Sequence, residues 1–283
     1  MIKIDLAKSA GFCFGVKRAL NIAFATINSA AGADKIYMLG DIVHNEEVIR
    51  QIEKSGIKKI AQLSQGKNKT LLISAHGVGI NTLRRAQQLG YKIVDATCPM
   101  VKEIHKIAAA MEKKGYQIIV IGDQQHNEVK GILGQLKKPA LVIDRLENIP
   151  LKTIQRLKKI AVVVQSTQNL EKVLQIVAAI KPLVAELKFC NTICRPTRIK
   201  QAEIKTLPLQ NDAMIIIGSK TSANTRRLYE ISKSLNPRSY WIQSPKDIKA
   251  GWFKGAKSIG VTSGASTPDS TTQKVIAHLR KIT

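Results

Sequence analysis

Three of the four cysteines recur at similar intervals, and each stands directly before a predicted helix. Cys13, Cys98 and Cys194 are 85 and 96 residues apart, and Pro99 and Pro196 suit the first turns of two of these helices. Unpaired amides at a helix N-terminus favour the thiolate, the form of cysteine that ligates iron. No fourth cysteine shares this spacing. Three thiolate ligands would leave one metal position open, as in a catalytic site. The alternative is that these are buried core cysteines.

The number of cysteines also limits the class of protein. Four are too few for a disulfide scaffold in a chain of 283 residues, and no Cys-x-x-Cys pair marks a zinc ribbon. Cys190 is out of register with the other three and lies on the apolar stretch 187–190. We therefore interpret Cys190 as structural.

Polar side chains that could hold an anion follow several predicted strands. His44, His76 and His126 each stand in such a turn, whereas His105 and His278 do not, and we interpret these two as structural or solvated. Hydroxyl and amide side chains occupy similar turns near the C-terminus, namely Ser222, Asn224 and Ser266. Neutral donors of this kind, with helix N-termini, can hold a diphosphate.

Glu128 is the acidic residue of the turn that contains His126, two residues earlier. It could deliver protons to a leaving hydroxyl, or it could be an ordinary glutamate stabilised by a helix N-terminus. Thr167 also has two interpretations. It could cap the helix that starts near Asn169, or its hydroxyl could be the partner of Glu128 in a cavity.

These residues follow six segments with one pattern, a short apolar strand, a polar turn and a helix. The strands are predicted at 36–39, 71–73, 118–121, 161–164, 214–217 and 258–261. They form three pairs whose spacing is similar to that of the cysteines, which predicts three similar α/β lobes with pseudo-three-fold symmetry. We expect lobes at 14–97, 98–193 and 194–283, with residues 1–13 joining the last as an edge strand. Turns at the carboxyl ends of parallel strands would then face one central cavity.

The chain is strongly basic, with 45 Lys and Arg against 20 Asp and Glu, a net charge of +25. This charge favours an acidic partner or a phosphorylated substrate. Nucleic acid is not the expected partner, because basic residues form no long run and aromatic residues make up only 4% of the chain. No apolar run approaches the roughly 18 residues that span a bilayer, and no signal peptide is visible, so we expect a cytoplasmic protein.

Seven short motifs in this order resemble the 4-hydroxy-3-methylbut-2-enyl diphosphate reductase family, and the resemblance covers nearly the whole chain. They lie at Gly11–Val16, Val43–Asn45, Ser74–Gly77, Asp95–Pro99, His126–Val129, Gly218–Asn224 and Gly260–Ser266. The resemblance implies one [4Fe–4S] cluster on Cys13, Cys98 and Cys194 at the centre of the lobes. It also implies that the polar turn residues listed above bind diphosphate, and that Glu128 handles protons beside Thr167.

The implied reaction is the last step of the non-mevalonate isoprenoid pathway. Two electrons and two protons would remove the substrate hydroxyl as water and give isopentenyl and dimethylallyl diphosphate. The basic surface suits an acidic electron donor such as ferredoxin or flavodoxin.

The sequence departs from the family pattern at a few positions. Ala223 stands where a second serine is common, and Pro196 and Lys200 are unusual after Cys194, so the helix geometry there is in question. One alternative is a quinolinate synthase-like [4Fe–4S] dehydratase, although the diphosphate-binding residues and the Gly-Phe-Cys start argue against it. The other is a basic nucleic-acid-binding protein with incidental cysteines.

Overall fold

The computed structural model describes residues 2–29 and 35–282, which contain twelve β-strands and ten α-helices. The strands form three separate four-stranded sheets, and every pairing within them is parallel. This confirms the predicted α/β class with three similar units. None of the helices in the described residues is long and apolar enough to cross a membrane.

The three sheets have the same topology: two central strands lie side by side, and one outer strand flanks each of them. The first sheet has the order β3-β2-β4-β5, with bounds Ile57–Ile60, Lys35–Leu39, Lys69–Ile73 and Lys92–Asp95. The second has the order β7-β6-β8-β9, with bounds Leu141–Ile143, Gln117–Ile121, Lys159–Val164 and Glu186–Phe189. The third has the order β11-β10-β12-β1, with bounds Ser239–Ile242, Ala213–Ile217, Ser258–Ser263 and Lys3–Leu6.

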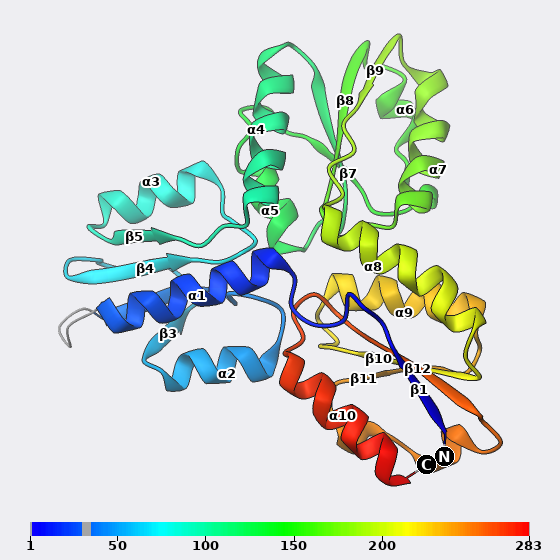
Figure 1. The fold of residues 1–283 in the computed structure, drawn as a ribbon. Coiled ribbons are helices and arrows are strands. Elements are labelled where there is room, and N and C mark those ends of the chain that lie inside the picture. The colour runs from blue at the N-terminus through cyan, green and yellow to red at the C-terminus, as the bar shows by residue number, and fades with distance from the viewer. Residues whose placement is uncertain (1, 30–34, 283) are drawn as a thin grey trace. The chain divides into compact units, whose positions relative to one another are not determined.

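The six strands predicted from apolar runs are the two central strands of each sheet. In five of these strands nearly every residue is buried, and in β10 all five residues are, whereas in β2 only Ile36 and Met38 are buried. Five outer strands, β3, β5, β7, β9 and β11, were not predicted, because they are short and have partly exposed faces, as in the sequence Ile-Lys-Lys-Ile of β3. Charged residues interrupt or flank the apolar residues of β3, β5 and β9, whereas β7 and β11 are mostly apolar but only three and four residues long. The N-terminal strand β1 pairs with β12 in the third sheet (Figure 1).

The described residues divide into two compact units. The first unit consists of Met1–Lys17, His44–Val48 and Arg195–Thr283, and it contains the third sheet. The second unit consists of Arg18–Val43 and Ile49–Cys194, and it contains the other two sheets. The lobe boundaries expected at 97 and 193 remain a prediction.

In the first unit, alternate residues of β10 enter two separate cores. Ile215 and Ile217 pack with helix α10 (Asp269–Ile282), whereas Met214 and Ile216 pack with Ile204 of helix α8 and with helix α9 (Ala223–Leu235). Helix α8 runs from Arg195 to Thr206, so Pro196 is accommodated in its first turn. The third sheet is therefore covered by helices on both faces, as expected for parallel strands.

The second unit follows the same rule. In its second sheet, β6 and β8 pack on one face against helix α7 (Leu170–Ile180) and on the other against helices α4 (Pro99–Lys113) and α5 (Asn127–Leu133). Its first sheet packs against helix α3 (Ile80–Gln88). The two remaining long helices are α1 (Phe14–Ser29) and α2 (Glu46–Lys54), and α6 is a single turn at Leu151–Ile154.

Candidate functional site

The three cysteines predicted as ligands have the same backbone setting. Each directly precedes a helix, α1, α4 or α8. Each donates its backbone N–H to the second residue after the strand β12, β4 or β8: Cys13 to Ala265 at 3.0 Å, Cys98 to Ala75 at 3.0 Å and Cys194 to Ser166 at 3.1 Å. The register of the cysteines is therefore a real structural repeat. All are partly exposed and not in disulfides.

These cysteines fit an iron–sulfur cluster by the chemistry of their donors. Each of the three is a cysteine outside any disulfide and stands at a helix start, where backbone N–H groups without intrahelical partners favour an anionic ligand. Cys190 has a different setting, as predicted. Its side chain packs against the core of the second sheet, and burial raises the pKa of its thiol, with nearby Lys188 acting in the opposite direction.

The polar site residues also occupy equivalent positions. His44, His126 and Ser222 are each the fifth residue after a central strand, in turns that begin with a glycine. His76, Thr167 and Ser266 are each the third residue after the other central strand. Thr167 thus shares a structural position with two predicted diphosphate-binding residues. This register was visible in the sequence and is a second reason to include Thr167.

In the first unit, the predicted anion-binding residues lie where β10 and β12 end. Ser222 caps α9, and its Oγ accepts from the N–H of Thr225 at 3.3 Å. The Nδ2 atom of Asn224 is buried and has no hydrogen-bond partner among the described residues. Ser266 donates its hydroxyl to the carbonyl of His44 at 2.8 Å. A buried amide donor with no partner is expected where a ligand is to bind.

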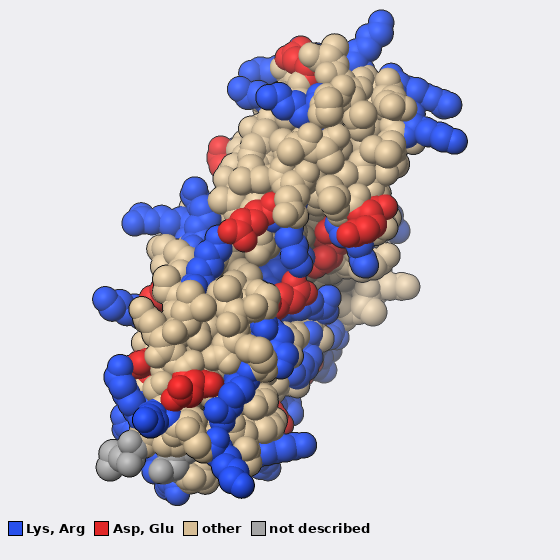
Figure 2. All heavy atoms as spheres, turned by 90° about the vertical axis from the view of Figure 1, so that its right-hand side faces the viewer, with Lys and Arg blue, Asp and Glu red and all other residues tan. Residues whose placement is uncertain are grey.

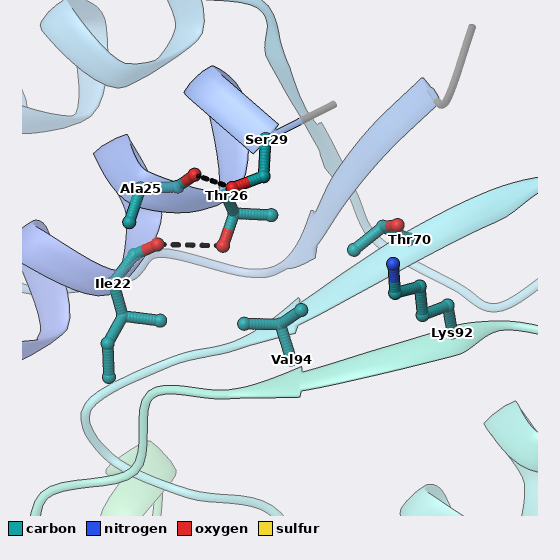
Figure 3. A pocket seen from close by; sticks show the side chains of 7 residues that line it. All are labelled: Ile22, Ala25, Thr26, Ser29, Thr70, Lys92 and Val94. Carbon is teal, nitrogen blue, oxygen red and sulfur yellow. Dashed lines mark hydrogen bonds between the residues drawn. The ribbon is translucent and has the colours of Figure 1, made fainter. Parts of the chain in front are cut away.

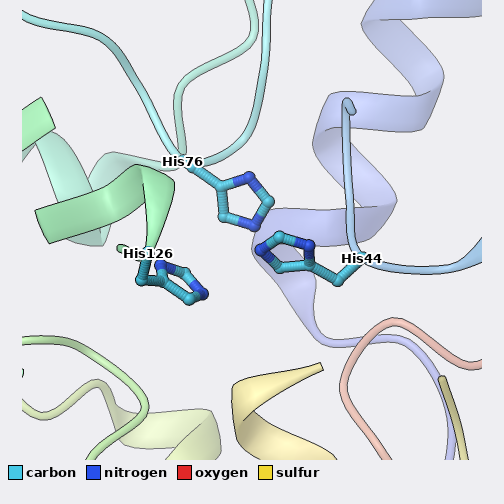
Figure 4. Close-up of side chains that lie close together, drawn as sticks. All are labelled: His44, His76 and His126. Carbon is cyan, nitrogen blue, oxygen red and sulfur yellow. The ribbon is translucent and has the colours of Figure 1, made fainter. Parts of the chain in front are cut away.

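In the second unit, His76 and His126 come together from different sheets. Their ring centroids are 5.4 Å apart and the rings are nearly perpendicular (Figure 4). Nδ1 of His126 accepts from the backbone N–H of Glu128 at 3.1 Å, so in the neutral ring Nε2 carries the hydrogen. His126 is therefore prepared to donate to an anion. His44, also drawn in Figure 4, belongs to the first unit.

Glu128 lies in the first turn of α5 and is only 2% exposed. Its Oε1 accepts from the backbone N–H of Ser166 at 2.5 Å, and its Oε2 accepts from the hydroxyl of Ser166 at 2.7 Å. Thr167, the next residue, accepts from Nε2 of Gln165 at 3.1 Å. The interpretation of Thr167 as a helix cap is wrong, because Asn169 itself caps α7. Ser166 was not predicted, since an unremarkable serine gives no sequence signal.

His105 is a structural residue, as predicted. It lies in α4 against two glycines: a Cβ at Gly77 would come within 2.9 Å of its ring, and one at Gly131 within 3.3 Å. Gly77 also has a positive φ of 71°, which favours glycine. Burial lowers the pKa of His105 to about 4; Asp95 opposes this shift and Lys102 adds to it. His105 therefore supports the turn that carries His76.

A pocket in the second unit contains none of the predicted site residues. It lies between α1 and strands β4 and β5 (Figure 3), and its lining consists of Ile22, Ala25, Thr26, Ser29, Thr70, Lys92 and Val94. Figure 2 shows Lys and Arg side chains spread over the visible face, with smaller acidic groups among them.

The chain is similar over its full length to one family of proteins. The family model described as LytB protein matches residues 4–280. The chain belongs to the LytB protein family. Two relatives of this LytB chain are named 4-hydroxy-3-methylbut-2-enyl diphosphate reductase. The Aquifex aeolicus (strain VF5) protein is 37% identical over 100% of this chain and 97% of its own length, and the Campylobacter fetus subsp. fetus (strain 82-40) protein is 39% identical over 100% and 99%.

Two solved structures that are similar to this chain are also diphosphate reductases by name. A structure of (E)-4-hydroxy-3-methyl-but-2-enyl diphosphate reductase, described as the terminal enzyme of the non-mevalonate pathway, has a TM-score of 0.72 and 37% identity, and the match covers 99% of this chain and 100% of that one. The E-1-hydroxy-2-methyl-but-2-enyl-4-diphosphate reductase from Plasmodium falciparum has a TM-score of 0.87 and 28% identity, with coverage of 98% and 87%. The resemblance found in the sequence motifs is confirmed.

Proposed function

We propose that this LytB-family chain reduces 4-hydroxy-3-methylbut-2-enyl diphosphate to isopentenyl and dimethylallyl diphosphate. Its full-length relatives carry the name of this reductase. The observation that carries the proposal is the repeated setting of Cys13, Cys98 and Cys194, each at a helix start and bound to the equivalent turn. Neither a dehydratase of another family nor a nucleic-acid-binding protein accounts for both findings.

Three cysteines would hold the cofactor and six polar residues the substrate. We propose that Cys13, Cys98 and Cys194 ligate one [4Fe–4S] cluster, which when bound supplies electrons and a Lewis-acidic iron. The diphosphate would accept hydrogen bonds from His44, His76, His126, Ser222, Asn224 and Ser266. The buried Nδ2 of Asn224 and the Nε2–H of His126 support this role, because each offers a donor to an anion.

The reaction consumes two electrons and two protons. The C–O bond to the substrate hydroxyl breaks, one proton leaves with that oxygen as water, and the other is added to the allylic carbon chain. Glu128 is the acid that we assign to the delivery of the proton that leaves with the hydroxyl as water, with Thr167 beside it. Ser166 holds both carboxylate oxygens of Glu128, which fixes the direction of the acid.

The electrons must come from a separate donor. An acidic carrier such as a ferredoxin or flavodoxin suits a chain with a net charge of +25. On the face drawn in Figure 2, Lys and Arg side chains are widely spread, which supports broad electrostatic attraction.

Anaerobic reconstitution tests the proposal. Iron and sulfide should both approach four per chain, the content of one [4Fe–4S] cluster. With dithionite as the reductant, the loaded protein should convert 4-hydroxy-3-methylbut-2-enyl diphosphate to the two products. A protein that takes up the cluster and leaves this substrate unchanged would refute the assigned reaction, and one that takes up no cluster would refute the assigned cofactor.

A further inference from the structure

Lys200 of helix α8 is a buried lysine in the first unit. Only 3% of its surface is exposed, and its Nζ donates to the backbone carbonyls of Ser9, Gly11 and Ser263, the last two at 3.1 and 3.0 Å. An ammonium group has three hydrogens, so these three carbonyls use its full donor capacity. Burying a charge is costly unless it is compensated in this way. The Lys200 side chain therefore binds the loop that contains Ser9 and Gly11 to the end of β12 at Ser263.

A second residue of α8 binds the same loop. Glu203, three residues after Lys200, accepts from the backbone N–H of Ser9 at 3.0 Å and also from the Ser9 hydroxyl. Both polar groups of the Ser9 backbone are thus bound to one helix. The N–H of Gly11 donates to Oγ of Ser263 at 2.6 Å, while its carbonyl binds Lys200.

The loop held in this way leads directly to Cys13. Gly11 has a φ of 95°, and a Cβ there would come within 2.0 Å of Asp269, so the loop has little room for another path. Cys13 donates its N–H to Ala265 at 3.0 Å, two residues after Ser263. Lys200 therefore joins the two chain segments that set the backbone position of Cys13.

We propose that Lys200 is a positioning residue that fixes the Cys13 loop against the end of β12 and so presents Cys13 for cluster ligation. The ligation part rests on the proposed function. Methionine at this position would fill a similar volume but leave three buried carbonyls without a donor, whereas glutamine would keep two N–H donors. Lys200→Met should therefore loosen the loop, and Lys200→Gln should do so less. Lys205, exposed near the end of the same helix, provides the matched control Lys205→Met.

Hydrogen exchange in the metal-free protein tests the positioning directly. In Lys200→Met the loop loses the charge-assisted bonds from Lys200 to its backbone carbonyls and should open more often. We therefore expect the amides of residues 7–16 to exchange about tenfold faster or more. Amides of β10, in the same unit, should keep their wild-type rates, as should both segments in Lys205→Met. Unchanged exchange at 7–16, or an equal rise in β10, would overturn the proposal.

Cluster uptake tests the consequence for ligation. After anaerobic reconstitution, Lys200→Met should hold less iron per chain than the wild type and show an altered electron paramagnetic resonance spectrum, and Lys200→Gln should recover part of both. A loosened loop with wild-type iron and spectrum would overturn the ligation part. Wild-type protein without iron would instead refute the cofactor assignment, and the exchange rates would still decide the role of Lys200 in the loop.

Discussion

Glu128 binds Ser166 through both carboxylate oxygens, at 2.5 Å to the backbone N–H and 2.7 Å to the hydroxyl. Glu128→Gln keeps an acceptor for the N–H, and the serine hydroxyl can turn to accept from the new amide, so the fold should survive. The acid is lost, and a positioned acid typically contributes about 10²–10⁴-fold in rate. We expect turnover to fall on that scale with iron content and substrate affinity retained. Wild-type turnover with a lowered thermal midpoint would show that Glu128 is only structural.

The four cysteines should differ in their effect on cluster content. Cys13→Ser, Cys98→Ser and Cys194→Ser each remove a thiol from the repeated helix-start setting, so each should lower iron per chain after anaerobic reconstitution. Cys190→Ser should stay near wild type, because Cys190 packs against the core of the second sheet. An equal loss of iron in all four variants would contradict the ligand assignment.

Asn224 should affect substrate binding more than stability. Its buried Nδ2 has no partner among the described residues, so Asn224→Ala breaks no bond of that atom. A hydrogen bond to a charged group contributes about 1.5–3 kcal/mol, so KM should rise roughly tenfold or more. Asn224→Asp should be worse, since a carboxylate repels diphosphate. Steady-state kinetics and thermal midpoints of both variants check this; an unchanged KM in both would remove Asn224 from the binding site.

His105 should make the folded state less stable in mild acid. Burial lowers its pKa to about 4 in the folded chain, against about 6.5 in an unfolded one. Between these values the unfolded chain binds the extra proton, so the free energy of unfolding falls as pH drops, by up to about 3 kcal/mol from this group. His105→Asn should remove that part of the slope. Denaturant titrations from pH 7 to pH 4 measure it, and parallel curves for both proteins would contradict the prediction.

Electron transfer from an acidic carrier should slow as salt rises. Exposed charges are screened beyond about 8 Å at physiological ionic strength, so the attraction of a chain with a net charge of +25 weakens. A small neutral reductant has no charge for the salt to screen, and turnover with it provides the comparison. If the rates with flavodoxin and with the neutral reductant fall in parallel, electrostatic docking is not the function of the basic surface.

The features that the sequence predicted are those with a local signal. Central strands such as β10 are continuous apolar runs, and Cys13, Cys98 and Cys194 differ in type from the residues around them. Thr167 could have been assigned more firmly from its register with His76 and Ser266. These signals sufficed for the fold class and the main site candidates.

Other features depend on contacts between residues far apart in the sequence. The outer strand β3 contains two exposed lysines and is stabilised by its neighbour β2 rather than by its own composition. Ser166 enters the candidate site only through its hydrogen bonds to Glu128. Lys200 acquires its proposed role only because a loop near the N-terminus folds over α8. Neither pairing leaves a trace in composition or periodicity.

The position of β1 sets an order for the folding of the chain. Lys3 lies opposite Ser258, so this strand cannot find its partner until nearly all of the protein has been synthesised. The strands of the other two sheets are much closer in sequence and can pair while the C-terminal segment is still being made. Cys13 follows β1 and depends on the turn after β12. Of the three cysteines proposed as ligands, the first to leave the ribosome is thus the last to reach its place, and insertion of the proposed cluster would follow the synthesis of β12.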